Sequence, residues 1–316
     1  MTTTAADQAM TRSSVEILTD QPVSTWFKCG GRAERFARPA TIDQLRECLG
    51  IDANLRVLGD GANLLVADSG VRELVVELSE GKFAEVVIDE RTGIVDAGGG
   101  VKLPQLITET VRRGLSGLET LGGIPATVGG AAAMNAGGAF GQFGDCVQSV
   151  TGLSRDGKLH ELSREKVIFD YRRSDFAGLR DFIVTRVRFK LAVLAAGDTS
   201  ARVKLKDVME YKKRTQPMAA DSAGCCFKNP TLSAAVEGIG AGGARVSAGL
   251  LIDRAGCKGL RIGSAEVSDR HANFFVAHAG CTAGDLIALM REVRRRVHDR
   301  FGVTIEPEVK VWGEVV

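Results

Sequence analysis

Three separated segments of the 316-residue sequence carry side chains that could perform acid–base chemistry on an anionic substrate. Arg172 lies in a Tyr-Arg-Arg-Ser run, Cys225 precedes Cys-Phe-Lys-Asn-Pro, and Glu308 follows Glu-Pro near the C-terminus. A guanidinium can hold two carboxylate oxygens side by side. A thiol, or a carboxyl group whose pKa is raised by burial, can donate a proton.

Each of these residues also has an ordinary structural interpretation. Arg172 could form a surface ion pair, and a glutamate beside a proline near a C-terminus is commonly an exposed edge residue. Cys225 could be a small buried apolar side chain, with the proton arriving through a water held by Glu308. The residue types alone leave these alternatives open.

Two glycine-rich loops could hold a phosphate-bearing ligand, because glycine lets backbone N–H groups approach an anion closely. One loop follows an apolar triplet and the other brackets Ile-Pro with two Gly-Gly pairs. A simple turn, or close packing of a helix on a sheet, is the alternative. Neither loop completes a Rossmann fingerprint or a P-loop. The expected cofactor-binding residues are Leu58, Gly59, Asp60, Gly61, Ala62, Asn63, Leu64, Gly122, Gly123, Ile124, Pro125, Thr127, Val128, Gly129, Gly130, Ala133 and Asn135.

The overall charge and the cysteine usage exclude several classes of protein. Basic and acidic residues number 41 and 39, without the excess expected of a general nucleic-acid or membrane-surface binder. The seven cysteines include no Cys-x-x-Cys pair, which favours a reducing compartment and no zinc site. The first 20 residues are polar, and no apolar run approaches 18 residues. We therefore expect a soluble cytoplasmic monomer without metal, nucleic-acid or membrane partners.

Short strands and a few helices alternate irregularly, which indicates an α+β fold. Apolar periodicity and capping patterns predict helices at Thr41–Leu49, Lys102–Arg113, Lys206–Arg214 and Thr282–Arg300. Strands are predicted at Arg56–Leu58, Leu74–Leu78, Ala84–Asp89, Ile94–Ala97, Val147–Leu153 and Phe182–Phe189. Residues 1–14 are expected to be disordered, and the small-residue tract Ala192–Thr199 suggests a domain boundary.

The ordered set of motifs resembles the UDP-N-acetylenolpyruvoylglucosamine reductase family from about Ser24 to Gly313. The most specific stretches are the loop Gly59-x-Gly61-x-Asn63, Gly123-Ile124-Pro125, Tyr171-Arg172-x-Ser174, Ala223-Gly224-x-x-Phe227-Lys228-Asn229-Pro230, His271-Ala272-Asn273-Phe274 and Glu306-Pro307-Glu308. Each stretch alone is common, but their order along the chain is specific to this family.

The resemblance implies a vanillyl-alcohol-oxidase-type FAD-binding fold over residues 15–200, with lobes at about 15–82 and 83–200. An α+β substrate-binding domain would follow at 201–316, in the subtype without an extra tyrosine-bearing loop. The implied reaction is the reduction of UDP-N-acetylglucosamine enolpyruvate to UDP-N-acetylmuramate for peptidoglycan synthesis. In it, NADPH reduces FAD, and hydride then passes from the reduced flavin to the enolpyruvyl ether.

The resemblance also implies the roles of single residues. Arg172 and Glu308 would stabilise and help protonate the enolic intermediate, and Cys225 stands where the family normally has the proton-donating serine. A thiol is a better acid than an alcohol, so this role survives chemically. The implied substrate-binding residues are Tyr171, Lys228, Asn229, Gln216 and His271, although His271 could equally be structural.

Two departures, Ala62 for serine and Ala126 for glycine, put single FAD contacts in doubt. Two other functions remain open at this point. An FAD-linked oxidase of the same fold would need an oxygen-reactive flavin, and the motif set favours the reductase. A flavin-binding protein without catalysis would explain the missing serine, but the presence of Arg172 and Glu308 argues against it.

Overall fold

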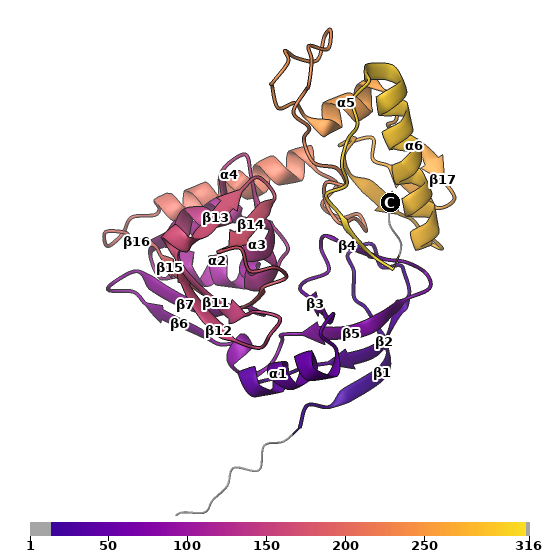
Figure 1. Cartoon of the computed structure of the whole chain (residues 1–316). Helices are drawn as coiled ribbons and strands as arrows, with labels where there is room; N and C mark the ends of the chain where they lie inside the picture. The colour runs from indigo at the N-terminus through magenta and orange to yellow at the C-terminus, as the bar shows by residue number, and fades with distance from the viewer. Residues whose placement is uncertain (1–13, 314–316) are drawn as a thin grey trace, which may run out of the picture.

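A computed structural model describes residues 14–313, so the expected disordered segment 1–14 lies almost wholly outside the described residues. The first of three units, at the bottom of Figure 1, is a four-stranded sheet in the order β1-β2-β5-β3. Strands β2, β5 and β3 are parallel and β1 is antiparallel to β2. Its elements are β1 (Ile17–Pro22), β2 (Arg32–Ala37), α1 (Ile42–Ile51), β3 (Arg56–Leu58), β4 (Leu64–Val66) and β5 (Val71–Glu77).

The second unit contains an antiparallel five-stranded sheet in the order β12-β11-β15-β7-β6. Helix α3 packs against β15, so that Val128, Ala131 and Ala132 enter the core of this unit. Its main elements are β6 (Val86–Asp89), β7 (Ile94–Gly98), α2 (Leu103–Arg112), α3 (Val128–Met134), β11 (Val147–Leu153), β12 (Leu159–Ser163) and β15 (Ile183–Lys190).

Shorter elements complete the second unit around its sheet. They are the 3-10 helices η1 (Gly81–Phe83), η2 (Leu118–Leu121), η3 (Phe143–Cys146) and η4 (Arg164–Lys166) and the strands β8 (Leu115–Ser116), β9 (Gly137–Gly138), β10 (Gly141–Gln142), β13 (Val167–Asp170), β14 (Arg173–Phe176) and β16 (Ala192–Val193). Strands β13 and β14 form an antiparallel hairpin that projects toward the third unit.

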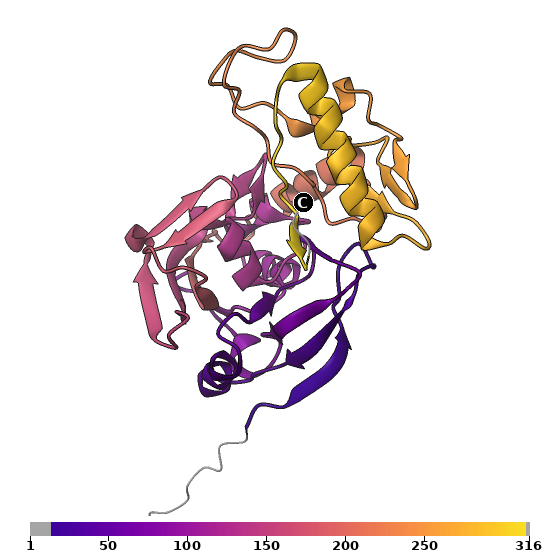
Figure 2. The same ribbon diagram turned by 45° about the vertical axis from the view of Figure 1, so that its right-hand side comes forward.

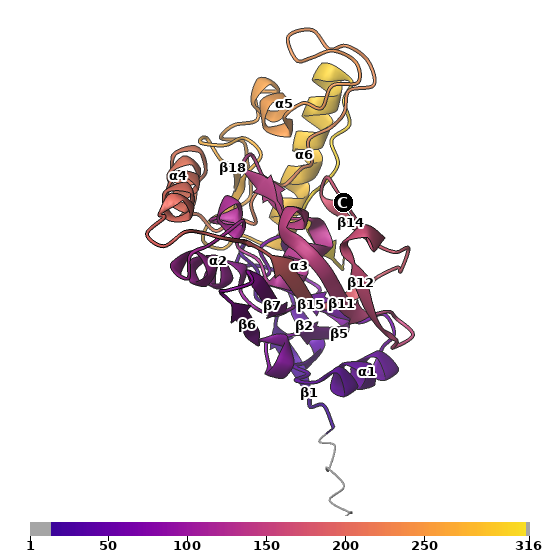
Figure 3. The same cartoon turned by 90° about the vertical axis from the view of Figure 1, so that its left-hand side faces the viewer.

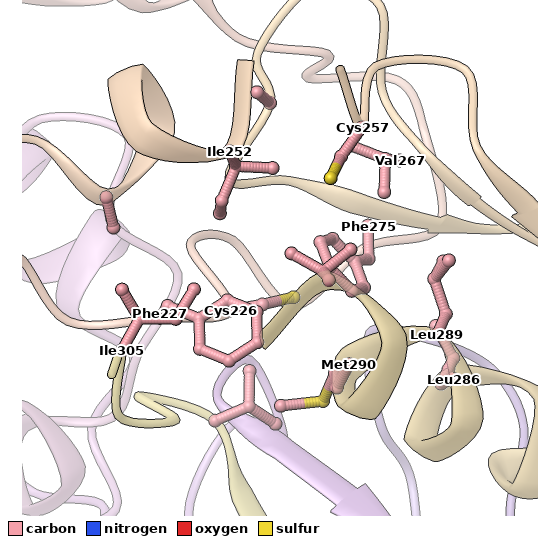
Figure 4. Packing of buried hydrophobic residues seen from close by; sticks show 14 of the residues in the cluster. Cys226, Phe227, Ile252, Cys257, Val267, Phe275, Leu286, Leu289, Met290 and Ile305 are labelled. Carbon is pink, nitrogen blue, oxygen red and sulfur yellow. The ribbon is translucent and has the colours of Figure 1, made fainter. Parts of the chain in front are cut away.

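The third unit surrounds the long helix α6, whose apolar face enters a core that includes Phe227 and Phe275 (Figure 4). Thr282 and Asp285 form a reciprocal capping box at the start of α6, a device worth about 1 kcal/mol. The elements are α4 (Ser200–Thr215), α5 (Ala248–Arg254), β17 (Arg261–Ile262), β18 (Ala265–Val267), β19 (Phe275–Ala277), α6 (Ala283–Phe301) and β20 (Lys310–Trp312).

Two connections tie the third unit to the first. After α6 the chain returns, and β20 pairs in parallel with β4 of the first unit, as the yellow strand in Figure 2 shows. Asp68 of the first unit accepts hydrogen bonds from the N–H groups of Ala283 and Gly284 at the start of α6, each at 2.9 Å. The C-terminal segment is therefore held by both units as it passes between them.

The α+β class and all the predicted elements are confirmed, with shifts of a few residues, and α4 begins six residues earlier than predicted. The second glycine-rich segment differs, because residues 128–134 form helix α3 and not a loop. Strands β1 and β2 had no counterpart in the prediction. Helix α4 lies over the second unit beside α2 (Figure 3), with Ala201 in that unit's core.

No helix in residues 14–313 is both long and apolar enough to cross a membrane. The loop between Pro230 and α5 extends away from the three units at the top of Figure 1.

Candidate active site

Arg172 occupies the tight turn of the β13–β14 hairpin, in a backbone conformation that is unusual for a residue other than glycine. Its φ is +54°, in the left-handed region that costs on the order of 1–2 kcal/mol. Its side chain is fixed by a hydrogen bond from Nη1 to the carbonyl of Gly137 at 2.9 Å. Such strain persists where surrounding contacts enforce it, and it is concentrated at functional sites. The turn therefore places the guanidinium in the space between the second and third units.

Glu308 is the carboxylate that faces this guanidinium. Arg172 Nε lies 2.5 Å from Glu308 Oε1, and both side chains are largely buried. The Nε–H is not aligned with the carboxylate oxygen, so the contact is ionic and Nε keeps no hydrogen-bond partner. Burial raises the pKa of Glu308, while the charges of Arg172 and Lys228 oppose this rise. Glu308 can therefore hold a proton more readily than an exposed glutamate.

The backbone around Glu308 is held from two sides. Its N–H donates to the carbonyl of Cys226 at 2.7 Å, and its carbonyl accepts from the side-chain amide of Asn63 at 3.0 Å. Cys226 belongs to the third unit and Asn63 to the first glycine-rich loop. The position of the carboxylate consequently depends on both units.

Cys225 and Cys226 are neighbours in an extended segment and point to opposite sides. Cys226 is fully buried and lies among Phe227, Phe275 and Met290 in the core (Figure 4). Cys225 is only partly buried and lines the cleft that contains Glu308. Side chains alternate in extended backbone, so a structural role for Cys226 leaves Cys225 facing the cleft.

The thiol of Cys225 is protonated at neutral pH. Burial raises its pKa to about 12, the Glu308 carboxylate adds to this increase, and Arg172 opposes it. The segment is fixed by Asn273, whose side chain donates to the carbonyl of Phe227 at 2.8 Å and accepts from its N–H at 2.9 Å. The Cys225 thiol is therefore protonated and held at a defined position in the cleft wall.

The three groups share one cleft of about 1060 Å³ between the units. Its walls are Trp26 and the first glycine-rich loop, the segment from Gly123 into α3, the end of α4, and the segment before Cys225. Most of the wall is apolar or small, with Arg172, Lys212 and Glu308 as its charged members. Such a cleft, with a few convergent polar groups, is typical of a ligand site.

A second cavity of about 590 Å³ adjoins the cleft, and Gly130 lines both. Here the two glycine-rich segments meet, since a Cβ on Gly59 would lie 3.0 Å from Thr127 Oγ1 and 3.9 Å from Gly130 Cα. The ammonium of Lys102 at this cavity forms an ion pair with Asp60 at 2.5 Å. An elongated, glycine-walled space with a cation beside it fits an extended dinucleotide with a flat ring at one end.

The predicted cofactor residues divide into three groups. Leu58, Gly59, Thr127, Gly129, Gly130 and Ala133 line the second cavity. Ala62, Asn63, Gly123, Ile124, Pro125 and again Gly130 line the cleft. The others, which line neither space, are Asp60, Gly61, Leu64, Gly122, Val128 and Asn135.

Those remaining residues have identifiable structural roles. Leu64 and Val128 are buried in apolar cores. Gly61 adopts a φ of +66° where a Cβ would lie 2.1 Å from the carbonyl oxygen of Ser24. Asn135 ends α3, and its amide group bonds to Gln142, Asp170 and Gly144. Asn135 also lines a further pocket together with Tyr171 and Arg172. The cofactor contacts of this third group stay predictions.

Four of the five predicted substrate residues lie at or beside the cleft. Gln216 lines it, while Tyr171, Lys228 and Asn229 line an adjacent pocket of about 610 Å³. The hydroxyl of Tyr171 accepts a hydrogen bond from the Asn229 N–H at 3.1 Å. His271 lines neither space. Its ring packs against Phe274, and Nδ1 accepts from the N–H of Asn273 at 3.3 Å, which favours the structural alternative.

Sequence reasoning did not single out Lys102, Lys212, Ser222 or Asn273. Asn273 lies inside a quoted motif, so its position was available as a signal. Lys102 is the first residue of a predicted helix, and Lys212 lies in a basic run at the end of another. Nothing in the local pattern separates these two lysines from solvent-exposed ones.

Comparisons with known proteins agree with this arrangement. A family model described as UDP-N-acetylenolpyruvoylglucosamine reductase, C-terminal domain, matches residues 216–312, and an FAD binding domain model matches residues 33–163. The reductase of Moorella thermoacetica is 37% identical over 99% of this chain and 98% of its own, and that of Desulfosudis oleivorans is 40% identical over 93% and 94%. The crystal structure of the Thermus caldophilus reductase superimposes with a TM-score of 0.76 at 38% identity, covering 94% of this chain and 98% of that one.

The chain therefore belongs to the UDP-N-acetylenolpyruvoylglucosamine reductase family, FAD-dependent oxidoreductases of peptidoglycan synthesis. The predicted fold, an FAD-binding part of two lobes followed by an α+β domain, is confirmed.

Proposed function

We propose that this protein uses NADPH to reduce UDP-N-acetylglucosamine enolpyruvate to UDP-N-acetylmuramate. The observation that carries the proposal is the convergence of Arg172, Glu308 and Cys225 on one cleft beside a glycine-walled cavity. Relatives that match nearly the whole chain bear the name of this reductase, which supports the same substrate here. The competing oxidase function has no comparable support from these relatives.

FAD would be held along the second cavity by Gly59, Thr127 and Gly130, and it would supply the hydride transfer between the two ligands. The remaining chemistry belongs to side chains. The Arg172 guanidinium carries the positive charge that a carboxylate-centred anion requires. Its Nε is paired with Glu308 Oε1 at 2.5 Å and its Nη1 donates to the carbonyl of Gly137, so the guanidinium is held in place beside the cleft.

Cys225 is proposed to deliver the proton to the substrate carbon. The thiol lines the cleft and keeps its proton at neutral pH, because burial raises its pKa to about 12. Glu308, whose pKa is also raised, lies in the same wall and can return a proton to the thiolate after the transfer. The alternative is that water bound by Glu308 protonates the carbon directly and Cys225 only packs.

A complete set of side chains comes from one chain, which supports a monomer as the working unit. We propose a cytoplasmic monomer, with residues 15–200 for the cofactor and the following residues for the substrate. Size-exclusion chromatography with light scattering at micromolar concentration checks the monomer, since a dimer would elute with twice the mass of 33.6 kDa.

The proposed reaction is tested by anaerobic absorbance titration of the purified holoprotein. We expect flavin bands that bleach with NADPH and return on addition of UDP-N-acetylglucosamine enolpyruvate. Flavin that is reoxidised only by oxygen would favour the oxidase. A protein that binds no FAD even after reconstitution would refute the proposal.

The role of Cys225 is tested by single turnover, with NADPH-reduced enzyme mixed with the sugar nucleotide. We expect Cys225→Ala to slow flavin reoxidation about 100-fold or more, as loss of a general acid does. Cys225→Ser should retain much of the rate, and flavin reduction by NADPH should be unaffected in both variants. Reoxidation of Cys225→Ala at the wild-type rate would leave the water held by Glu308 as the proton donor.

A further inference from the structure

Lys212 is a cation in the cleft wall to which neither the motifs nor the proposed mechanism gives a role. It lies in the last turn of α4, and its aliphatic chain crosses Gly123. A Cβ on that glycine would lie 3.1 Å from Lys212 Cδ and 3.7 Å from Nζ. Within residues 14–313, its ammonium has no carboxylate partner and no side-chain hydrogen bond. A half-buried ammonium without a counter-ion is costly unless something outside the chain binds it.

Ser222, which lines the same cleft, provides an independent observation. It is 6% exposed and lines the cleft, yet its hydroxyl has no hydrogen-bond partner. Within the described part of the chain, Ser222 Oγ is the one buried side-chain polar atom with neither a hydrogen-bond partner nor an ion-pair partner. Buried polar groups in folded proteins are otherwise hydrogen-bonded. That this exception lines the cleft indicates a polar ligand that contacts the Ser222 hydroxyl.

The charges around Lys212 identify the sign of that ligand. Arg172 repels the ammonium, while Glu308 and Cys225 line the same cleft. The carboxylate of Glu119, on the packed helix η2, is already bound by the Ser116 hydroxyl and the Gly117 N–H. Two cations thus face the cleft against the single carboxylate of Glu308, so an oxyanion would be attracted.

We propose that Lys212 and Ser222 form an oxyanion-binding subsite that takes a carboxylate or phosphate group of a ligand entering the cleft. The inference rests on the proposed function, because NADPH and the enolpyruvyl sugar nucleotide both carry such groups. Desolvation lowers the pKa of Lys212 to about 8, and Arg172 adds to the decrease. An anion bound beside the ammonium would raise this pKa again, so binding takes up protons at alkaline pH.

The test uses the holoenzyme and four variants: Lys212→Met, Lys212→Arg, Ser222→Ala, and Lys213→Met as the matched control on an exposed neighbour. Rapid mixing gives the Kd of NADPH from flavin reduction and the Kd of the sugar nucleotide from reoxidation, between pH 6.5 and 9.5. Lys212→Met should weaken at least one Kd about tenfold at pH 7, as loss of a charge-assisted hydrogen bond does. The ligand whose Kd changes is the one that supplies the oxyanion.

Three further results are expected. The affinity of the wild-type enzyme for that ligand should fall as the pH rises through about 8. This fall should be absent in Lys212→Met. Lys212→Arg should restore affinity without the pH dependence, because arginine stays charged. Ser222→Ala should weaken binding of the same ligand, whereas Lys213→Met should change neither Kd. Both Kd values within twofold of wild type in Lys212→Met would overturn the subsite.

Failure of the proposed function would be recognised separately, as wild-type flavin that NADPH does not reduce. Isothermal titration of wild type and Lys212→Met with inorganic pyrophosphate then decides the subsite. Weaker binding by Lys212→Met at pH 7 supports it. Equal binding by the two proteins, or no binding by the wild type, excludes it.

Discussion

The charge of Lys212 should lower the free energy of unfolding of the ligand-free protein, and this decrease can be measured. A ligand that supplies an oxyanion would offset the cost of holding an ammonium in the cleft, but the free protein bears it alone. Replacement of Lys212 by methionine keeps the length and apolar character of the side chain and removes the charge. We therefore expect Lys212→Met to stabilise the flavin-free protein at pH 7, although it is expected to weaken ligand binding.

The size and pH range of the effect follow from the pKa. Desolvation, with a contribution from Arg172, lowers the pKa of Lys212 from 10.5 to about 8. At about 1.4 kcal/mol per pH unit, this lowering corresponds to at most about 3 kcal/mol. Between pH 8 and 10.5 the unfolded chain binds more protons than the folded one, so wild-type stability relative to Lys212→Met rises with pH. The full cost is present below pH 8 and disappears above 10.5.

The assay is urea unfolding of the flavin-free proteins, followed by tryptophan fluorescence in a buffer without phosphate or sulfate. The free energy of unfolding of Lys212→Met should exceed that of wild type by about 1–3 kcal/mol at pH 7. The difference should shrink toward zero by pH 10.5. The free energy of unfolding of Lys213→Met should stay within about 0.5 kcal/mol of the wild-type value at pH 7 and at pH 10.5. A variant less stable than wild type at pH 7, or a difference independent of pH, would refute the reasoning.

Three further predictions concern other parts of the molecule. Asp68→Ala should lower the unfolding free energy by about 1–2 kcal/mol, because it leaves the N–H groups of Ala283 and Gly284 without their acceptor; thermal melting of the variant and of Asp68→Asn measures this. Gly100→Ala should abolish soluble folded protein or cost about 3 kcal/mol or more, because the added Cβ would overlap a backbone carbonyl; soluble yield and circular dichroism measure the loss. Iodoacetamide should alkylate Cys225 at pH 7 at least about a thousandfold more slowly than a free cysteine, with about a tenfold gain per pH unit, as peptide mass spectrometry can follow.

Local signals explain why much of the fold could be predicted from the sequence. Helix α6 was predicted within a residue at each end, because its capping box and the spacing of its apolar residues are both local features of the sequence. Strand β15 alternates apolar residues with Arg186 and Arg188, and this pattern identifies the buried face. For the segment of helix α3, the sequence favours a ligand loop and leaves a helix packed on a sheet as the alternative, because two adjacent glycines at its start oppose helix formation. Packing on the sheet outweighs that local cost.

The site was predictable only where a motif supplied its members. Arg172, Cys225 and Glu308 are distant in sequence, and no periodicity states that Arg172 and Glu308 approach within 2.5 Å. Lys212 belongs to no motif, and in a run of basic residues its type does not distinguish it from the exposed Lys213 beside it. Its role depends on which face of α4 meets the cleft, and long-range packing decides that.

The arrangement also explains why the proposed catalytic groups depend on contacts far from the cleft. Arg172 is carried by a hairpin of the second unit, and Cys225 by an extended segment of the third. Glu308 lies where the chain passes from α6 to β20, held by Asn63 on one side and by the backbone of Cys226 on the other. A shift between units would therefore separate the guanidinium from the carboxylate without altering either residue. Misplacement of a reacting group by about 1 Å can lower a reaction rate about 100-fold. Loss of the Asp68 contact should therefore lower the turnover rate by a larger free-energy equivalent than it lowers the free energy of unfolding.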